Sequence, residues 1–108
     1  MSKPARHEMA AELYAGTATE AQFQAAVVEL ATALGWLAVH FRQMLGNPAG
    51  YPDLTLLRDD RYVLAELKSE TGKVSIKQQM WHAEAARRGV TVYVWRPSSW
   101  PEIQEILR

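Results

Sequence analysis

Two carboxylates and one lysine are spaced so that they can act together. Asp53 precedes the apolar run at residues 54–57, and Glu66 and Lys68 lie near the end of a second apolar run, two positions apart. The polar residues between the runs predict a β-hairpin, and residues i and i+2 of a strand point to the same face. Both acids and the ammonium group are therefore expected to meet at one end of a sheet. Metal-dependent hydrolysis of a phosphodiester bond requires such a set of groups.

The length and composition indicate one soluble domain with a single hydrophobic core. The chain has 108 residues, of which 48% are hydrophobic and 22% charged. It contains no cysteine, so a metal would be held by carboxylate, carbonyl and water oxygens, which suits Mg²⁺ or Mn²⁺. No apolar run has the length of a membrane span, and no signal peptide opens the chain. We therefore expect a cytoplasmic protein with neither a membrane partner nor a nucleotide cofactor.

The charges are unevenly distributed along the chain. The formal net charge is 0, which is mild evidence against a nucleic-acid-binding protein. Residues 42–96, however, contain nine basic and six acidic residues, and two of these acids are the candidate metal ligands. We therefore expect a local basic surface. Arg42, Lys73 and Lys77 lie near the expected mouth of the site and are candidates for phosphate contacts.

The remaining pattern predicts a mixed α/β domain, because helical spacing of apolar residues alternates with strand-forming runs. Predicted helices span residues 4–14, 17–34, 75–88 and 100–107, and predicted strands span residues 36–41, 54–57, 62–68 and 90–95. The order α-α-β-β-β-α-β-α gives a mixed sheet with helices on both faces. We expect one domain over residues 1–108, composed of an N-terminal helical extension (1–16), a core (17–96) and a C-terminal helix (97–108).

A third carboxylate is expected at the start of the first core helix. Thr17 and Glu20 fit a capping box, and Glu20 shares a helix face with the apolar Phe23. The Glu20 carboxylate is therefore expected to point toward the sheet rather than into bulk water. The capping box explains Glu20 nearly as well as metal binding does.

The second long helix is expected to bring an amide group to the site. Ser75 and Gln78 fit another capping box, and Gln78 could also orient Lys68 or the attacking water. His82, on the same face of this helix, is expected to be solvent-facing or partly packed. The backbone carbonyl of Leu67, between the acid and the lysine, is a further candidate metal ligand.

The order of these motifs resembles the virus-type replication-repair nuclease family, VRR-NUC, of the PD-(D/E)xK nuclease superfamily. The resemblance covers about residues 17–96, and five short motifs carry it together although each is weak alone. They are Glu20-x-x-x-Gln24, Gly50-Tyr51-Pro52-Asp53-Leu54, Glu66-Leu67-Lys68, Ser75-x-x-Gln78-x-x-Trp81, and Gly89 before the apolar strand.

Matched residue by residue, the resemblance implies a restriction-endonuclease-like fold and a metal-dependent endonuclease. It implies metal binding by Glu20, Asp53 and Glu66, catalysis by Lys68 together with the two acids of the hairpin, and a supporting role for Gln78. It also implies Mg²⁺ or Mn²⁺ as cofactor, a homodimer, and branched DNA such as four-way junctions or flaps as substrate.

Other interpretations stay open at this point. An aspartate at a strand start is usually a cap or turn residue, and a Glu-x-Lys pair on a strand is usually an exposed salt bridge. The apolar residues around Glu66 make an exposed pair harder to accommodate, and buried ionisable groups need a reason. A non-catalytic DNA-binding or subunit module that retains the fold is the main alternative. A purely structural α/β domain would leave the order of the motifs unexplained.

Overall fold

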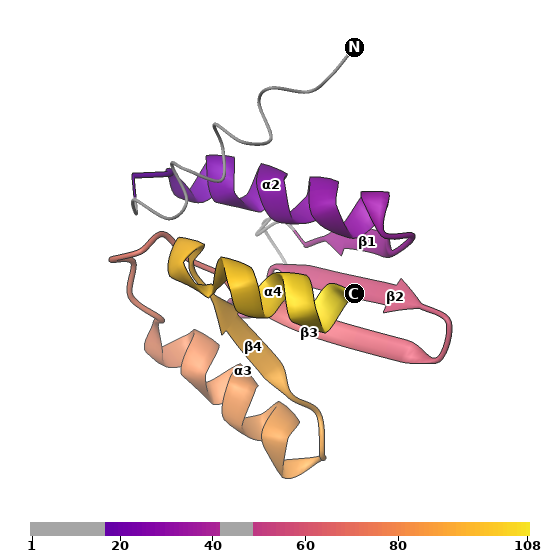
Figure 1. Cartoon of the computed structure of the whole chain (residues 1–108). Coiled ribbons are helices and arrows are strands. Elements are labelled where there is room, and N and C mark those ends of the chain that lie inside the picture. The colour runs from indigo at the N-terminus through magenta and orange to yellow at the C-terminus, as the bar shows by residue number, and fades with distance from the viewer. Residues whose placement is uncertain (1–16, 42–48) are drawn as a thin grey trace.

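The computed structural model describes residues 17–41 and 49–108, which form the predicted alternation of helices and strands (Figure 1). In chain order the elements are α2 (Glu20–Ala33), β1 (Leu37–His40), β2 (Leu54–Arg58), β3 (Arg61–Leu67), α3 (Ile76–Arg87), β4 (Val92–Trp95), the 3₁₀ helix η1 (Pro97–Ser99) and α4 (Trp100–Leu107). The helix predicted over residues 4–14 and the candidate Arg42 lie outside the described residues. Within the described ranges, no helix is both long and apolar enough to cross a membrane.

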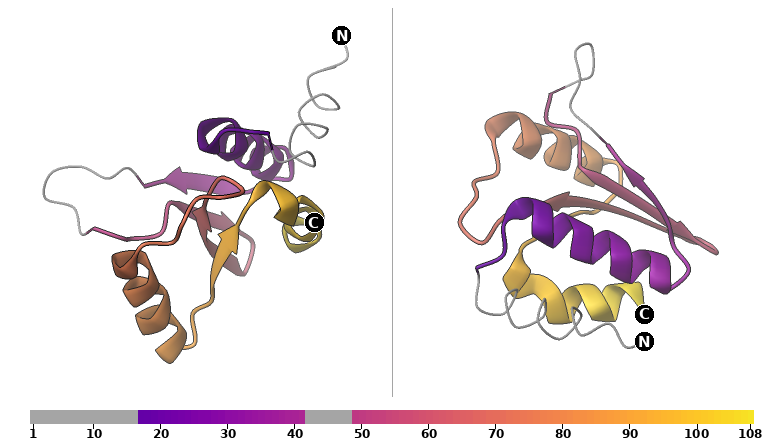
Figure 2. Two further views of the ribbon diagram at one scale, coloured as in Figure 1. Left: turned by 90° about the vertical axis from the view of Figure 1, so that its left-hand side faces the viewer. Right: turned by 90° about the horizontal axis from the view of Figure 1, so that it is seen from above.

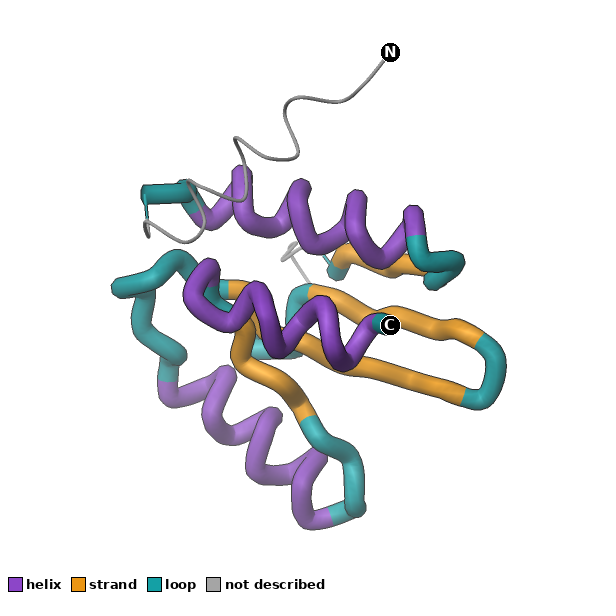
Figure 3. Tube along the Cα trace, in the orientation of Figure 1, coloured by secondary structure: helices purple, strands orange, loops and turns teal. Residues whose placement is uncertain are grey.

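The strands form a four-stranded mixed sheet in the order β1-β2-β3-β4. β1, β2 and β3 pair antiparallel, and β4 returns parallel to β3 after the crossover through α3 (Figure 3). The β2–β3 turn includes Asp59, whose φ of 53° lies in the left-handed region that aspartate tolerates better than most residues. The prediction of a restriction-endonuclease-like mixed sheet flanked by helices is confirmed.

The N-terminus of α2 differs from the prediction in its capping residue. Thr19, not Thr17, caps the helix: its hydroxyl accepts from the amide of Gln22 at 3.1 Å, and Gln22 Oε1 accepts from the amide of Thr19 at 2.9 Å. Both threonines have a suitable partner three positions later, so the motif alone does not choose between them. Ala18 and Phe23 flank the Thr19 cap at the positions of a hydrophobic staple, and both are buried in the core.

The hydrophobic core lies between one face of the sheet and the helices α2 and α4, which run side by side (Figure 2). Alternate residues of β2 and β3 point into it, as expected for strands with one fully packed face. Its fully buried members include Phe23 and Val27 from α2, Leu54, Leu56, Ala65, Leu67 and Trp95 from the sheet, and Ile103 and Leu107 from α4.

The opposite face of the sheet is covered only in part, by α3 (Figure 2). No residue of α3 is buried, and an apolar cavity of about 370 Å³ lies between this helix and the sheet, lined by residues that include Leu64 and Trp81. The strand register places Leu37, Leu57 and Tyr62 in one cross-strand row on this face. Their exposed fractions are 71%, 40% and 54%.

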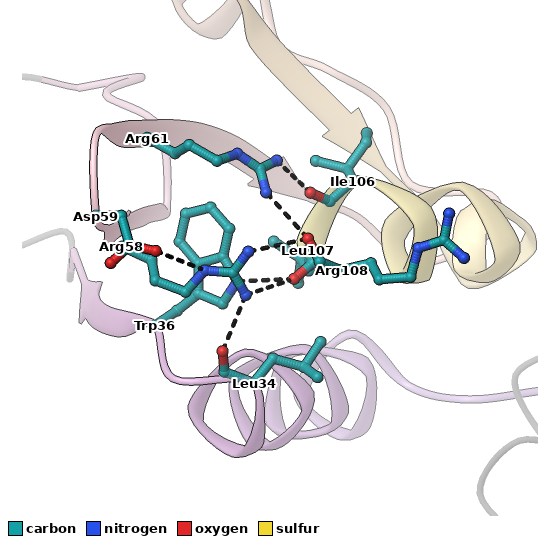
Figure 4. Close-up of polar contacts among 8 residues, drawn as sticks. All are labelled: Leu34, Trp36, Arg58, Asp59, Arg61, Ile106, Leu107 and Arg108. Atoms are coloured by element: carbon teal, nitrogen blue, oxygen red, sulfur yellow. Dashed lines mark hydrogen bonds and ion pairs between the residues drawn. The ribbon is translucent and has the colours of Figure 1, made fainter.

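Two arginines at the turn end of the hairpin bind the end of α4 (Figure 4). Arg58 and Arg61 both lie over the ring of Trp36, at 4.6 and 4.9 Å from its centroid, and the Trp36 indole donates to the carbonyl of Leu107 at 2.9 Å. The last carbonyls of a helix lack hydrogen-bond donors within the helix, and these side chains donate to them instead. Arg58 donates to Leu34 (2.9 Å), Leu107 (3.0 Å) and Arg108 (2.9 Å), and Arg61 donates to Arg108 (3.2 Å) and Ile106.

Candidate active site

Asp53 is held beside Glu66 by the backbone of the hairpin. The β2–β3 pairing ends at Leu54 opposite Ala65, so Asp53 and Glu66 are the next pair of positions along the ladder. The side chain of Asp53 continues the pairing: its Oδ2 accepts from the amide of Leu67 at 2.9 Å. Asp53 is thereby fixed to the residue that follows Glu66, which explains why a separation of 13 positions in sequence gives two adjacent acids.

Glu66 is a buried carboxyl group with an unusual proton affinity. Its side chain is 1% exposed, on the sheet face that α3 covers. Burial, then the side-chain hydrogen bond and negative charge of Asp53, raise the pKa of Glu66 from 4.5 to about 9. The charge of Glu20 also raises this pKa, and the ammonium group of Lys68 lowers it. Two adjacent acids resist ionising together, and the ammonium group of Lys68 offsets this only in part.

Lys68 follows Glu66 on the same face, two positions along the chain. The amide of Lys68 donates to the carbonyl of Trp95 at 3.0 Å, which extends the β3–β4 pairing through this residue. Its side chain is half-buried, and its charge acts on Glu66 strongly enough to lower the pKa of that group. The structure therefore brings Asp53, Glu66 and Lys68 together at one end of the sheet.

Gln78 caps α3, as one prediction had it, and the same side chain also contacts the site. Its Oε1 accepts from the amide of Ser75 at 2.8 Å and its own amide donates to the Ser75 hydroxyl at 3.1 Å, which completes the capping box of α3. The Nε2 group of the same side chain donates to Oε2 of Glu66 at 2.9 Å. The cap thus fixes the side chain that holds Glu66, and Gln78 contacts the acid rather than Lys68.

His82 is partly packed, as one of the two expectations had it, and it also faces the site. Its Nε2 lies 3.8 Å from Oε1 of Glu66, and its side chain is 16% exposed. Burial, and then the charge of Lys68, lower the pKa of His82, although Asp53 acts in the other direction. One signal in the sequence could have found this residue: His82 lies four positions after Gln78, on the same face of α3.

The chain segment before Asp53 runs directly against α3. Gly50 has a φ of +89°, and a Cβ atom there would lie 2.6 Å from the backbone carbonyl carbon of Lys77. Next to it, the indole of Trp81 donates to the carbonyl of Ala49 at 3.0 Å. A side chain at Gly50 would push this segment and the first turn of α3 apart, so the glycine sets how closely the two parts of the site approach.

Glu20 and Leu67 are less clearly placed as metal ligands. Glu20 is the first residue of α2 and is exposed, contrary to the expectation that it points away from bulk water. Among residues 17–41 and 49–108, no three or more acids, histidines or cysteines are grouped closely enough to hold a metal ion. Glu20 is thus near enough to raise the pKa of Glu66, but it is too far away to form one metal-ligand group with Asp53 and Glu66. Its metal role, and that of the Leu67 carbonyl, stay predictions.

The candidates for phosphate contact are exposed lysines. Lys73 and Lys77 flank the N-terminus of α3, and neither has a hydrogen-bond or ion-pair partner in the described part of the chain. The described arginines counted toward the basic surface are instead engaged within the protein. Arg58 and Arg61 bind α4, Arg87 and Arg88 bind Glu84, and Arg96 binds the carbonyls of residues 69, 70 and 72.

The chemistry of Asp53 and Glu66 fits a divalent cation. Oε1 of Glu66 is buried and has no hydrogen-bond partner, and the two neighbouring carboxyl groups raise the cost of ionising both. A bound divalent cation would offset that charge. Mg²⁺ is commonly held by one or two carboxylates, with water and substrate phosphate oxygens completing its coordination, so the absence of a third described acid is compatible with it.

Comparison with protein-family models matches residues 3–98 to the VRR-NUC domain. Searches of curated proteins and of solved structures gave no significant match. The matched residues include all of the motifs quoted above and every candidate site residue.

Proposed function

Since the chain belongs to the VRR-NUC family of nucleases, we propose that it is a metal-dependent DNA endonuclease that cuts branched DNA, such as four-way junctions or flaps. One observation supports the catalytic part of the proposal most strongly. Glu66 is 1% exposed, and its pKa is raised to about 9 beside Asp53 and Lys68. Perturbed ionisable groups that converge in this way are typical of functional sites.

The side chains have separate roles in the proposed reaction. Asp53 and Glu66 would hold the cation, which when bound would supply Lewis-acid chemistry to activate water and the phosphate. Lys68 orients the water and neutralises charge on the phosphate. Gln78 fixes Oε2 of Glu66 through the 2.9 Å hydrogen bond. The oxygen of water would bond to phosphorus as one P–O ester bond breaks, and the proton that the water loses would balance the one that the departing oxygen takes up.

The proposed substrate contacts lie around the N-terminus of α3. Lys73 and Lys77 are exposed there, on the two sides of the Ser75 cap. Each would contact a phosphate, which positions DNA without reading its sequence. Symmetric cutting of a four-way junction requires two sites on one substrate, so we propose that the protein acts as a homodimer.

Cleavage of branched, flapped and linear DNA tests the proposal. The wild type, Asp53→Asn and Lys68→Ala are compared with Mg²⁺, with Mn²⁺ and with EDTA. We expect cutting by the wild type alone, only with metal, and fastest on branched substrates. Equal cleavage by all three proteins would contradict the site assignment. If the wild type bound DNA but cut no substrate, a non-catalytic binding module would replace the nuclease.

A further inference from the structure

The two oxygens of the Glu66 carboxylate face two different residues of α3. Oε2 accepts a hydrogen bond from Nε2 of Gln78 at 2.9 Å. No N–H or O–H group of the described residues donates to Oε1, which lies 3.8 Å from Nε2 of His82, and that nitrogen has no hydrogen-bond partner among them either. Because Gln78 and His82 are four positions apart, they lie one above the other on the helix. α3 therefore presents one polar side chain to each oxygen of the same acid.

Both unpartnered atoms are shielded from water. The Glu66 side chain is 1% exposed and the His82 side chain is 16% exposed. A buried polar atom without a partner loses its hydrogen bonds to water, so the two atoms gain from pairing with each other. An approach of roughly 0.6–1.1 Å would bring them to the ordinary hydrogen-bond range.

We propose that His82 is a positioning residue for Glu66, with its Nε2–H group donating to Oε1. Together with Gln78 it fixes the plane of the carboxylate at both ends. Each carboxylate oxygen has two lone pairs, so one hydrogen bond to each oxygen leaves room for a cation. The proposal rests on the proposed metal-dependent function, because an oriented Glu66 matters through the cation it would bind. Residues that orient a metal ligand in this way typically change metal affinity by 10–100-fold when they are replaced.

Mn²⁺ affinity measured by calorimetry on the full chain tests this role without requiring cleavage. His82→Phe keeps a planar ring but cannot donate, and we expect it to bind Mn²⁺ roughly 10–100-fold more weakly than the wild type. His82→Gln places an amide donor near the same position, and we expect it to recover most of the loss. His40→Phe is the matched control on the exposed β1 histidine, with unchanged affinity expected. Wild-type affinity in His82→Phe, or no recovery in His82→Gln, would overturn the proposal.

The tautomer of His82 supplies a second measurement that does not depend on any variant folding. Nitrogen NMR of the metal-free wild type at a pH above about 9, where Glu66 is ionised, should show the proton on Nε2. A proton on Nδ1 would overturn the proposal, because Nε2 could then only accept, or bind a metal directly. If the wild type failed to bind Mn²⁺ while His82 carried its proton on Nε2, the proposed function would fail and the His82–Glu66 contact would stand.

Discussion

The two faces of the sheet are built in different ways. The face under α2 and α4 is filled by apolar side chains, and Arg58 and Arg61 bind the end of α4 at its edge. The other face carries Glu66 and is covered by α3, which buries no residue and leaves a cavity of about 370 Å³. The first face provides stability, and the second holds ionisable groups whose burial opposes it. The proposed site therefore lies on the face where packing contributes least.

The largest effect is expected from neutralising Asp53. Asp53→Asn removes one of the two proposed cation ligands, and we expect cleavage to fall by about 10²–10⁴-fold while the folded state is retained, because the loss of one of two like charges relieves Glu66. Asp59→Asn is the control: it makes the same change on the exposed turn, where a φ of 53° also suits asparagine. Steady-state cleavage and urea denaturation of both variants measure this. A fully active Asp53→Asn protein would mean that the cleavage site is not on this face of the sheet.

A pair of isoleucines compares the packing of the two faces. Ile103 of α4 is 0% exposed and Ile76 of α3 is 83% exposed. We expect Ile103→Ala to lower the free energy of unfolding by about 2–5 kcal/mol, because it leaves a cavity in the core. Ile76→Ala should change it by no more than about 0.5 kcal/mol. Urea denaturation measures both, and similar losses would show that α3 is as tightly packed as α4.

The pH dependence of stability reports on Glu66. With a folded pKa of about 9 and an ordinary value of 4.5, Glu66 holds a proton in the folded state that the unfolded chain releases over this range. The metal-free protein should therefore lose stability as pH rises from about 4.5 toward 9, with a slope of at most about 1.4 kcal/mol per pH unit from this group. Glu66→Gln should flatten the curve, and Glu102→Gln, on the exposed side of α4, should not.

Urea denaturation at several pH values measures that difference. Mn²⁺ should stabilise the wild type more at high pH than at low pH, because cation binding requires the ionised carboxylate. A wild-type curve parallel to that of Glu66→Gln would mean that Glu66 titrates normally.

The smallest effect is expected from the exposed lysines. Lys73→Ala and Lys77→Ala each remove one proposed phosphate contact, so DNA affinity should fall several-fold and the salt dependence of binding should drop by about one unit for each. Arg87→Ala is the control, since Arg87 is already paired with Glu84 at 3.0 Å. Binding titrations at several salt concentrations measure these slopes. An equal loss in the arginine variant would place DNA along all of α3 rather than at its N-terminus.

The order of elements and the approach of Asp53 to Glu66 could be predicted from the sequence because their signals are local. The apolar runs fix the strands, and the pairing of Leu54 with Ala65 then brings Asp53 to Glu66. The capping box of α3 was likewise predictable, because Ser75 and Gln78 are three positions apart. The family match over residues 3–98 agrees with the motif order.

The roles of the charged residues could not be predicted because their contacts are distant in sequence. Arg58 and Arg61 bind carbonyls 45 to 50 positions away, so a count of basic residues could not show that they are engaged. The approach of His82 to Glu66 was not predicted because Glu66 is on a strand, and only the four-residue spacing from Gln78 points to it. The cap of α2 was wrongly assigned to Thr17 for another reason. Thr17 and Thr19 each have a suitable partner three positions later, so the capping-box pattern fits both.

The contact at Gly50 bears on how this site could be inherited as sequences diverge. Most distances in a protein depend on side chains, so they drift as neighbouring residues are replaced and repacked. Here the backbone of Gly50 meets the backbone at Lys77, with a would-be Cβ only 2.6 Å from its carbonyl carbon. No replacement of Lys77 alters that backbone spacing, and any replacement of the glycine does. The spacing between this segment and α3 thus depends on the lack of a side chain at position 50.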